Sequence, residues 1–131
     1  MRRAFFVSLL AAALAACACG SGTSPATVKS QATCSPNGTA LKIQAQNLHF
    51  DTSCLAAPAG SSFTITLDNQ DNGIPHNVSI YRSPSRSKPL FQGKVVVGVA
   101  STTYQVPALP PGTYYFQCDV HPAMNGAFVV K

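Results

Sequence analysis

Hydrophobic and polar residues alternate with a period of two through most of the chain after residue 40. The alternating segments are 41–46, 62–67, 77–81, 94–97, 102–106, 113–118 and 127–130. A period of two places successive side chains on opposite faces of a β-strand. Turn-forming residues separate these segments at 58–60, 68–73, 83–89 and 110–112. Because no window shows a sustained helical period, we predict an all-β fold in which two sheets pack as a sandwich.

The length of the chain allows one such domain. It has 131 residues, and domains typically have about 100–200. Residues 18–33 are mostly Gly, Ser, Thr, Ala and Pro, a composition typical of a flexible tether, here with a reach of about 20–25 Å. We therefore expect the folded domain to occupy residues 34–131, close to the ~100 residues of a small β-sandwich.

The first residues have the pattern of a secretory signal. Arg2 and Arg3 precede the segment 4–16, in which Ser8 is the one polar residue. A basic start and an apolar run of about 7–15 residues indicate a signal peptide, since about 20 apolar residues are needed to span a bilayer. We expect residues 1–16 to be removed and the protein to be exported, and we expect no transmembrane helix.

The sequence Leu14-Ala15-Ala16-Cys17 resembles the lipobox of bacterial lipoproteins. The resemblance implies cleavage before Cys17, lipid on Cys17, a tether over 17–33, and an anchor on the periplasmic or cell-surface side of a membrane. Bacterial lipoproteins carry three acyl chains on this cysteine. Two membrane-binding groups are enough for stable anchoring, so such a protein would be held firmly. The alternative is an ordinary signal peptide in which Cys17 is incidental. Cys19 fits the motif less well and has no assigned partner.

Charge and composition exclude several classes of function. Without residues 1–16, the chain has seven basic residues, four Asp and no Glu, which gives a net charge of +3. This is far from the clustered positive charge of nucleic-acid-binding proteins. Four carboxylates offer little for paired-carboxylate catalysis, and three His are too few for a trinuclear copper cluster or a Cu/Zn dismutase site. We expect a protein that is not an enzyme and that does not bind nucleic acid.

Three potential metal ligands stand at intervals of three, beginning with the last residue of the segment 113–118: Cys118, His121 and Met124. A thiolate, an imidazole and a thioether suit copper in both oxidation states, whereas zinc gains nothing from a thioether. Met124 is the one Met after the initiator. Chance would rarely place a single Met six residues after Cys118. The alternatives are that Met124 fills a gap in the core and that His121 is an ordinary surface residue.

A second imidazole must come from elsewhere in the chain. His76 lies in Pro75-His76-Asn77-Val78, where a loop turns into a predicted strand. His49 lies within an alternating pattern, with no turn and no other ligand type beside it. We therefore take His76 as the further ligand and His49 as a surface or hydrogen-bonded residue.

Two motifs together resemble the cupredoxins, the small type 1 (blue) copper proteins. They are Pro-His-Asn-Val at 75–78 and Tyr-x-Phe-x-Cys-x-x-His-Pro-x-Met-x-Gly at 114–126. The Cys-x-x-His-x-x-Met loop is similar in length to that of the amicyanins in this family. The resemblance covers roughly residues 41–131 and implies a Greek-key β-sandwich that binds one type 1 copper ion.

The resemblance also implies a role for each site residue. His76 and His121 would bind copper through ring nitrogens, Cys118 through its thiolate, and Met124 as a long axial ligand. Asn77 would form a hydrogen bond across to the other ligand loop and shield the sulfur, and such outer groups hold the ligands in place. The alternative for Asn77 is an ordinary residue at the start of a strand.

The function implied by this resemblance is electron transfer between a redox donor protein and an acceptor protein. Partners would dock at the edge of His121, on an apolar patch of Ile74, Pro75, Pro122 and Ala123; the alternative is that these four residues only pack the loops together. Pro122 stands where the binuclear copper centre of cytochrome oxidase has its second Cys, which excludes a binuclear site.

Two other functions use the same ligands. The first is copper storage or delivery, which calls for an exposed and exchangeable metal. The second is an enzyme domain such as part of a nitrite reductase, which needs a second copper site that this chain lacks.

Two further features allow two interpretations each. In an exported protein, Cys34 and Cys54 are expected to form a disulfide worth roughly 3 kcal/mol in the chain-entropy model, or else to be buried thiols. The segment 81–94 carries four cations and no acid. It is either a solvated loop or a docking surface for an acidic redox partner, for which complementary charge raises the association rate.

Overall fold

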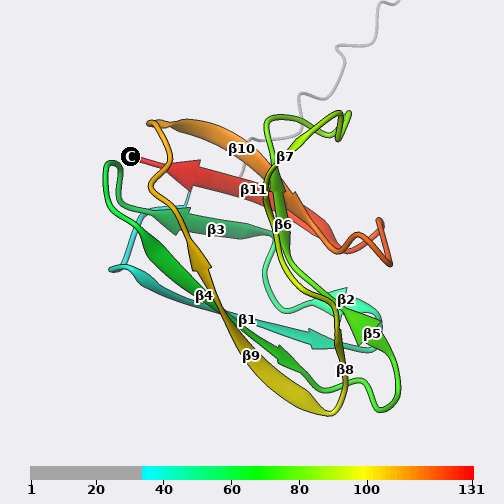
Figure 1. Cartoon of the computed structure of the whole chain (residues 1–131). Helices are drawn as coiled ribbons and strands as arrows, with labels where there is room; N and C mark the ends of the chain where they lie inside the picture. Colours follow the sequence, from blue (N-terminus) through cyan, green and yellow to red (C-terminus); the bar gives the residue numbers. More distant parts are fainter. Residues whose placement is uncertain (1–33) are drawn as a thin grey trace, which may run out of the picture.

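Strand β4 (Phe63–Asn69) shows how the alternating pattern becomes a sheet: every second side chain of the strand is buried. The structure, a computed structural model, describes residues 34–131. These residues form β-strands and loops without a helix, in two sheets packed face to face (Figure 1). The predicted all-β sandwich is therefore confirmed.

The first sheet has four strands in the order β2–β1–β4–β9, with β1 at Ala40–Gln46, β2 at His49–Phe50 and β9 at Ala100–Val106. Strands β1 and β4 are parallel, while β4 and β9 are antiparallel. Strands β1 and β2 form a hairpin whose turn residues, Asn47 and Leu48, have φ angles of 54° and 59°. Two positive φ angles in succession match the right-handed twist of a tight hairpin.

The second sheet has five strands in the order β3–β11–β10–β6–β7. Their bounds are Cys54–Ala57 (β3), Asn125–Val130 (β11), Gly112–Gln117 (β10), Ser79–Tyr81 (β6) and Pro89–Gln92 (β7). Strands β10 and β11 are antiparallel neighbours, and β3 runs parallel to β11. A short ladder of β5 (Pro75–His76) and β8 (Val96–Val97) lies apart from both sheets. In Figure 1, β5 and the loop between β10 and β11 lie at the same end of the sandwich.

The core fills the space between the two sheets. Phe63 of β4 stacks on Phe128 of β11 with ring centroids 5.4 Å apart. Ile65, Leu67 and Phe116 are fully buried beside them. Burying one such side chain contributes about 1.5–3 kcal/mol. The same cluster continues into the site end of the sandwich and provides a rigid support for it.

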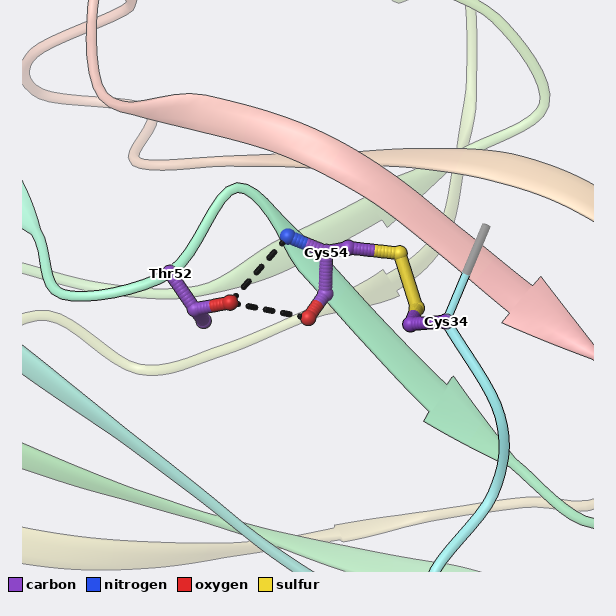
Figure 2. The surroundings of a disulfide bond; sticks show 3 residues. All are labelled: Cys34, Thr52 and Cys54. Atoms are coloured by element: carbon purple, nitrogen blue, oxygen red, sulfur yellow. Dashed lines mark hydrogen bonds between the residues drawn. A yellow bond between two sulfur atoms is a disulfide. The ribbon is translucent and has the colours of Figure 1, made fainter. Parts of the chain in front are cut away.

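A disulfide joins Cys34 and Cys54, the start of the described chain and the start of β3 (Figure 2). The S–S distance is 2.01 Å, the Cα–Cα distance is 6.0 Å, and 20 residues separate the two cysteines. The Thr52 hydroxyl holds the same strand end, donating to the Cys54 carbonyl at 2.9 Å and accepting from its N–H at 3.2 Å. The two cysteines are bridged rather than free thiols.

The N-terminal predictions lie outside the described residues. They comprise the signal peptide at 1–16, lipid on Cys17, the tether at 17–33 and the unassigned Cys19. Among residues 34–131, no helix is long and apolar enough to cross a membrane.

Candidate metal centre

Strand β10 ends directly before Cys118, so Cys118 lies at the end of the sandwich, where its side chain is fully buried. The chain then turns back on itself. The N–H of Cys118 donates to the Met124 carbonyl at 2.9 Å, and the N–H of Met124 donates to the His121 carbonyl at 2.9 Å. These two bonds close the segment 118–124 into a compact turn, so that its ligand-type side chains share one small volume.

Gly126 lets β11 start directly after this turn. A β-carbon at this position would lie 2.6 Å from the ring of Phe116 and would also collide with the Ser53 carbonyl. Any larger residue would push β11 away from β10 and β3. The glycine therefore allows the turn to sit tightly against the sheet.

Three donor atoms from the two predicted motifs converge on one point. The Sγ of Cys118 lies 3.7 Å from Nδ1 of His76 and 3.9 Å from Nδ1 of His121, and the two nitrogens are 3.2 Å apart. His76 comes from β5, 42 residues before Cys118 in the chain. Within residues 34–131, these three form the one group of His, Cys and carboxylate side chains able to hold a metal ion together.

The size and chemistry of this triangle fit one copper ion. Bonds of about 2.0 Å to nitrogen and about 2.3 Å to sulfur, typical of a borderline metal, can be met from a point inside it. One thiolate and two imidazoles are the trigonal donor set of blue-copper sites. His76 and Cys118 are fully buried and His121 is partly buried. Such burial restricts solvent access and fixes the environment of a bound metal.

Met124 is buried in the core beside the site, whereas His49 is a surface residue. Met124 is 3% exposed and belongs to the buried cluster that contains Cys118. His49 lies on β2, is exposed, and has its Nδ1 2.7 Å from the Asn47 carbonyl. The structure thus brings His76 to the cysteine and leaves His49 at the surface.

Asn77 links the two ligand loops. Its Oδ1 accepts the N–H of Asp119 at 2.7 Å, and its Nδ2 donates to the Gly93 carbonyl and to Oδ2 of Asp119, each at 2.9 Å. Asn77 is 1% exposed, so water cannot reach its amide, and these protein groups are its hydrogen-bond partners instead. The link fixes the residue after His76 to the residue after Cys118.

The Asp119 carboxylate is a functional group that the sequence analysis did not single out. Oδ2 accepts from the Ser79 hydroxyl at 2.6 Å and from Gln92 at 3.2 Å, while Oδ1 accepts from the Tyr81 hydroxyl at 2.6 Å. Burial raises the pKa of Asp119, but hydrogen bonds led by that from Ser79 outweigh burial and lower the pKa to about 2. Burial, together with Asp119, raises the pKa of Tyr81 to about 12. The carboxylate therefore stays charged at neutral pH and Tyr81 stays a donor.

Asp71 is a second group that sequence reasoning missed. Its Oδ2 lies 2.8 Å from Nε2 of His76. The turn between β1 and β2 holds the carboxylate from the other side, with N–H groups of Asn47 at 2.5 Å and Leu48 at 3.0 Å. The Leu48 bond, followed by the His76 ring and the Asn47 bond, lowers the pKa of Asp71 against the opposing effect of burial. A carboxylate beside Nε2 accepts a hydrogen bond from an Nε2–H group and leaves the Nδ1 lone pair for a metal.

Apolar residues flank the two histidines of the site in the chain and reach the surface. Of the four predicted patch residues, Ile74 and Pro75 are partly exposed, and Pro122 and Ala123 are exposed. Strand β8 extends this surface, because Val97 pairs with Pro75 and is 58% exposed. Strand β8 was not expected to contribute, since its pairing with β5 is formed by residues distant in the chain.

Comparisons with known proteins place the chain in a family. Residues 7–130 match the model of the cupredoxin-like domain. The chain is 32% identical over 131 residues to amicyanin-alpha of Methylorubrum extorquens, covering 100% of both chains. The chain therefore belongs to the cupredoxin family.

Solved structures agree with this fold. Dithionite-reduced auracyanin from Roseiflexus castenholzii matches with a TM-score of 0.63 and 23% identity, over 71% of this chain and 97% of that one. Auracyanin A from Chloroflexus aurantiacus, described as a blue copper protein, matches with a TM-score of 0.62 and 20% identity, over 72% and 99%. The predicted family is confirmed, and the predicted copper cofactor agrees with both the family and the donor set.

Proposed function

We propose that this protein is a type 1 blue copper electron-transfer protein. His76, Cys118 and His121 bind one copper ion, and Met124 is the long axial ligand. The observation that carries this proposal is the convergence of one sulfur and two ring nitrogens, 3.2–3.9 Å apart, at a buried end of the sandwich. Copper in such a site supplies one-electron exchange between Cu(II) and Cu(I).

The protein's own contribution is to hold the ligands still. Asp71 fixes the His76 ring, Asn77 fixes Asp119 beside Cys118, and the turn closed by Met124 fixes the rest of the loop. Groups held in place by packing and hydrogen bonds need little rearrangement when charge changes. This arrangement favours repeated electron exchange over chemistry on a bound substrate, so we propose a carrier and not an enzyme.

Electron exchange with a partner takes place at the His121 edge. His121 is the ligand-type side chain that is partly exposed, whereas His76 and Cys118 are buried. The apolar surface of Pro122, Ala123 and the β5–β8 ladder surrounds it. A redox partner protein docks there, because apolar contact excludes water from the interface.

The carrier acts outside the cytoplasm, tethered to a membrane. The signal pattern at residues 1–16 and the lipobox ending at Cys17 support export and lipid attachment. Residues 17–33 form the tether, and residues 34–131 form the cupredoxin domain. A disulfide between Cys34 and Cys54 is in keeping with an oxidising compartment.

The visible spectrum and voltammogram of the copper-loaded protein test the electron-transfer proposal. We expect an intense thiolate-to-copper band and reversible one-electron cycling, with the band lost in Cys118→Ser while circular dichroism still shows a folded sandwich. Transfer of copper to a chelator within minutes, without reversible cycling, would favour copper storage or delivery instead. A band retained in Cys118→Ser would show that another group binds the metal.

Tethering is tested separately by following the full-length protein after expression. We expect it in the membrane fraction with a mass increase from lipid, and we expect Cys17→Ser to release it. Membrane association unchanged in Cys17→Ser would contradict the proposed anchor.

A further inference from the structure

We propose that the loop between β6 and β7 is a docking surface for an acidic redox protein, and that Asp119 and Tyr81 connect this surface to Cys118. The proposal rests on the proposed function, because it requires electron-carrying copper at Cys118. This surface is separate from the apolar surface around His121. A carrier with two such surfaces can recognise its donor and its acceptor by different chemistry.

The first observation is the charge of the loop. Arg82, Arg86 and Lys88 are all exposed, and residues 82–88 include no acid. In the part of the chain that the structure describes, none of the three forms an ion pair with a carboxylate. Their charges are therefore available to an outside anion.

The second observation is where the carboxylates lie. Asp51, Asp68 and Asp71 are on or beside the strands of the first sheet, and Asp119 is occupied by its hydrogen bonds. The β6–β7 loop connects two strands of the second sheet, of which β7 is at the edge (Figure 1). Three of the four carboxylates thus lie away from the cationic loop, and a local concentration of one charge orients an approaching charged partner.

The third observation is that the loop has defined local structure. The N–H of Arg86 donates to the Ser83 carbonyl at 3.2 Å, and the hydroxyls of Ser83 and Ser85 are 2.8 Å apart. Pro84 and Pro89 further restrict the backbone. A loop that is already ordered loses less entropy when a partner binds.

The fourth observation is the connection from this loop to the metal ligand. Tyr81 ends β6 and immediately precedes Arg82, and its hydroxyl donates to Oδ1 of Asp119 at 2.6 Å. Asp119 is bonded covalently to Cys118. The route from the loop to the sulfur therefore consists of covalent bonds and one short hydrogen bond.

The surroundings of Tyr81 suit a protein partner. Tyr115, which is partly exposed, pairs with Tyr81 across β10 and β6, and Arg86 lies close enough to interact electrostatically with both tyrosines. Tyr and Arg are enriched in protein interfaces. One electron passes between the partner's centre and the copper, so that one is reduced as the other is oxidised. The exchange forms and breaks no covalent bond, and no proton is transferred.

Small redox ions of opposite charge test the surface. The reduced copper protein is mixed with hexacyanoferrate(III), a trivalent anion, and separately with tris(phenanthroline)cobalt(III), a trivalent cation, at low ionic strength. We expect Arg86→Glu to slow oxidation by the anion about five- to tenfold and not to slow oxidation by the cation.

The matched control is Lys131→Glu, which changes the net charge equally at an exposed residue outside this loop. We expect it to change the anion rate less than about twofold. An equal loss in the two variants would mean that net charge alone acts, and would overturn the proposal. A copper protein that exchanges electrons with neither reagent would instead contradict the proposed function.

Binding is measured independently of electron transfer with hexacyanochromate(III), an inert paramagnetic anion. In the amide NMR spectrum of the reduced protein, we expect line broadening at residues 81–88 and at Tyr115. Broadening centred on His121 would overturn the proposal.

Tyr81→Phe tests the route: we expect it to keep the broadening at the loop but to slow oxidation by the anion at equal driving force. An unchanged rate in Tyr81→Phe would overturn the route through Tyr81.

An anionic membrane is the competing occupant of a cationic loop. Vesicles of phosphatidylglycerol and phosphatidylcholine distinguish it, with full-length Cys17→Ser as the probe, because this variant lacks the proposed lipid attachment. Vesicle binding abolished by Arg86→Glu, together with anion rates equal in the two charge variants, would assign the loop to lipid and overturn the proposal.

Discussion

The carboxylate of Asp71 lies 2.8 Å from Nε2 of His76, while Nδ1 of the same ring faces Cys118. The carboxylate is itself held by two backbone N–H groups from the β1–β2 turn. One side of the imidazole is thus fixed by a charged acceptor and the other is left to the metal. This relationship predicts that Asp71 influences the metal without touching it.

Asp71→Asn should raise the reduction potential. A carboxylate hydrogen bond favours the more positively charged state, Cu(II), more than a neutral amide does. The expected rise, on the order of tens of millivolts, is measured by cyclic voltammetry of the copper protein. Asp51→Asn, an equal charge change at an exposed residue directly after β2, is the control. A potential that stays the same or falls in Asp71→Asn would contradict the role of this bond.

Met124→Leu should keep the copper and also raise the potential. A thioether is a weak donor that stabilises Cu(II), and leucine replaces its volume in the buried cluster without a donor atom. Metal content, the visible band and the voltammogram are measured on the same sample. A retained band with an unchanged potential would show that Met124 fills the core and is not the axial ligand.

Asn77→Ala should destabilise the apoprotein. The change leaves the N–H of Asp119 and the Gly93 carbonyl without their present partner in a buried place, which costs about 2–3 kcal/mol. Urea unfolding of the metal-free protein measures this loss directly. Asn37→Ala, at an exposed position, should change stability by less than about 0.5 kcal/mol. A loss no larger than in this control would mean that the link between the loops is not energetically significant.

The stability of the apoprotein should fall as the pH decreases from about 4 toward 2. The pKa of Asp119 is lowered to about 2 in the folded protein, whereas an ordinary Asp in an unfolded chain has a pKa of about 3.9. Between these values the unfolded state binds more protons, so acid favours unfolding, and the contribution is fully present above pH 4.

The pH dependence is measured by urea unfolding at a series of pH values. Asp119→Asn should be less stable at neutral pH and should show a smaller decrease between pH 4 and 2. Asp51→Asn is the control with the same charge change. An unaltered slope in Asp119→Asn would contradict the assignment of this pH dependence to Asp119.

The local pattern of the sequence was sufficient to predict most of the strands and the three converging donors. Strand β4 follows its alternation residue by residue, because one of its faces packs on the core and the other does not. Strand β3 was not predicted, since three consecutive residues of it are buried and the sequence there has no alternation. Part of the segment predicted as a turn, at Pro89, begins β7, where pairing with β6 overrides the local turn preference.

The outer hydrogen bonds of the site could not be predicted, because they depend on register and on distant turns. Asp71 meets His76 within one loop, but the groups that hold its carboxylate are 23 and 24 residues earlier, at Leu48 and Asn47. Asp119 meets Ser79 and Tyr81 because β6 pairs with β10 in one particular register, Tyr115 opposite Tyr81 and Gln117 opposite Ser79. A shift of one residue would turn these side chains to the other face of the sheet.

The disulfide has a mechanical consequence. Cys34 is the first described residue, and its bridge to Cys54 attaches the chain to β3, which is hydrogen-bonded in parallel to β11. A pull arriving along the backbone from residue 33 is therefore borne by the shear of the β3–β11 ladder, and strand β1 is spared from being peeled off its sheet. For a domain held by its leading end, the load therefore enters the second sheet at β3 and not the first sheet at β1.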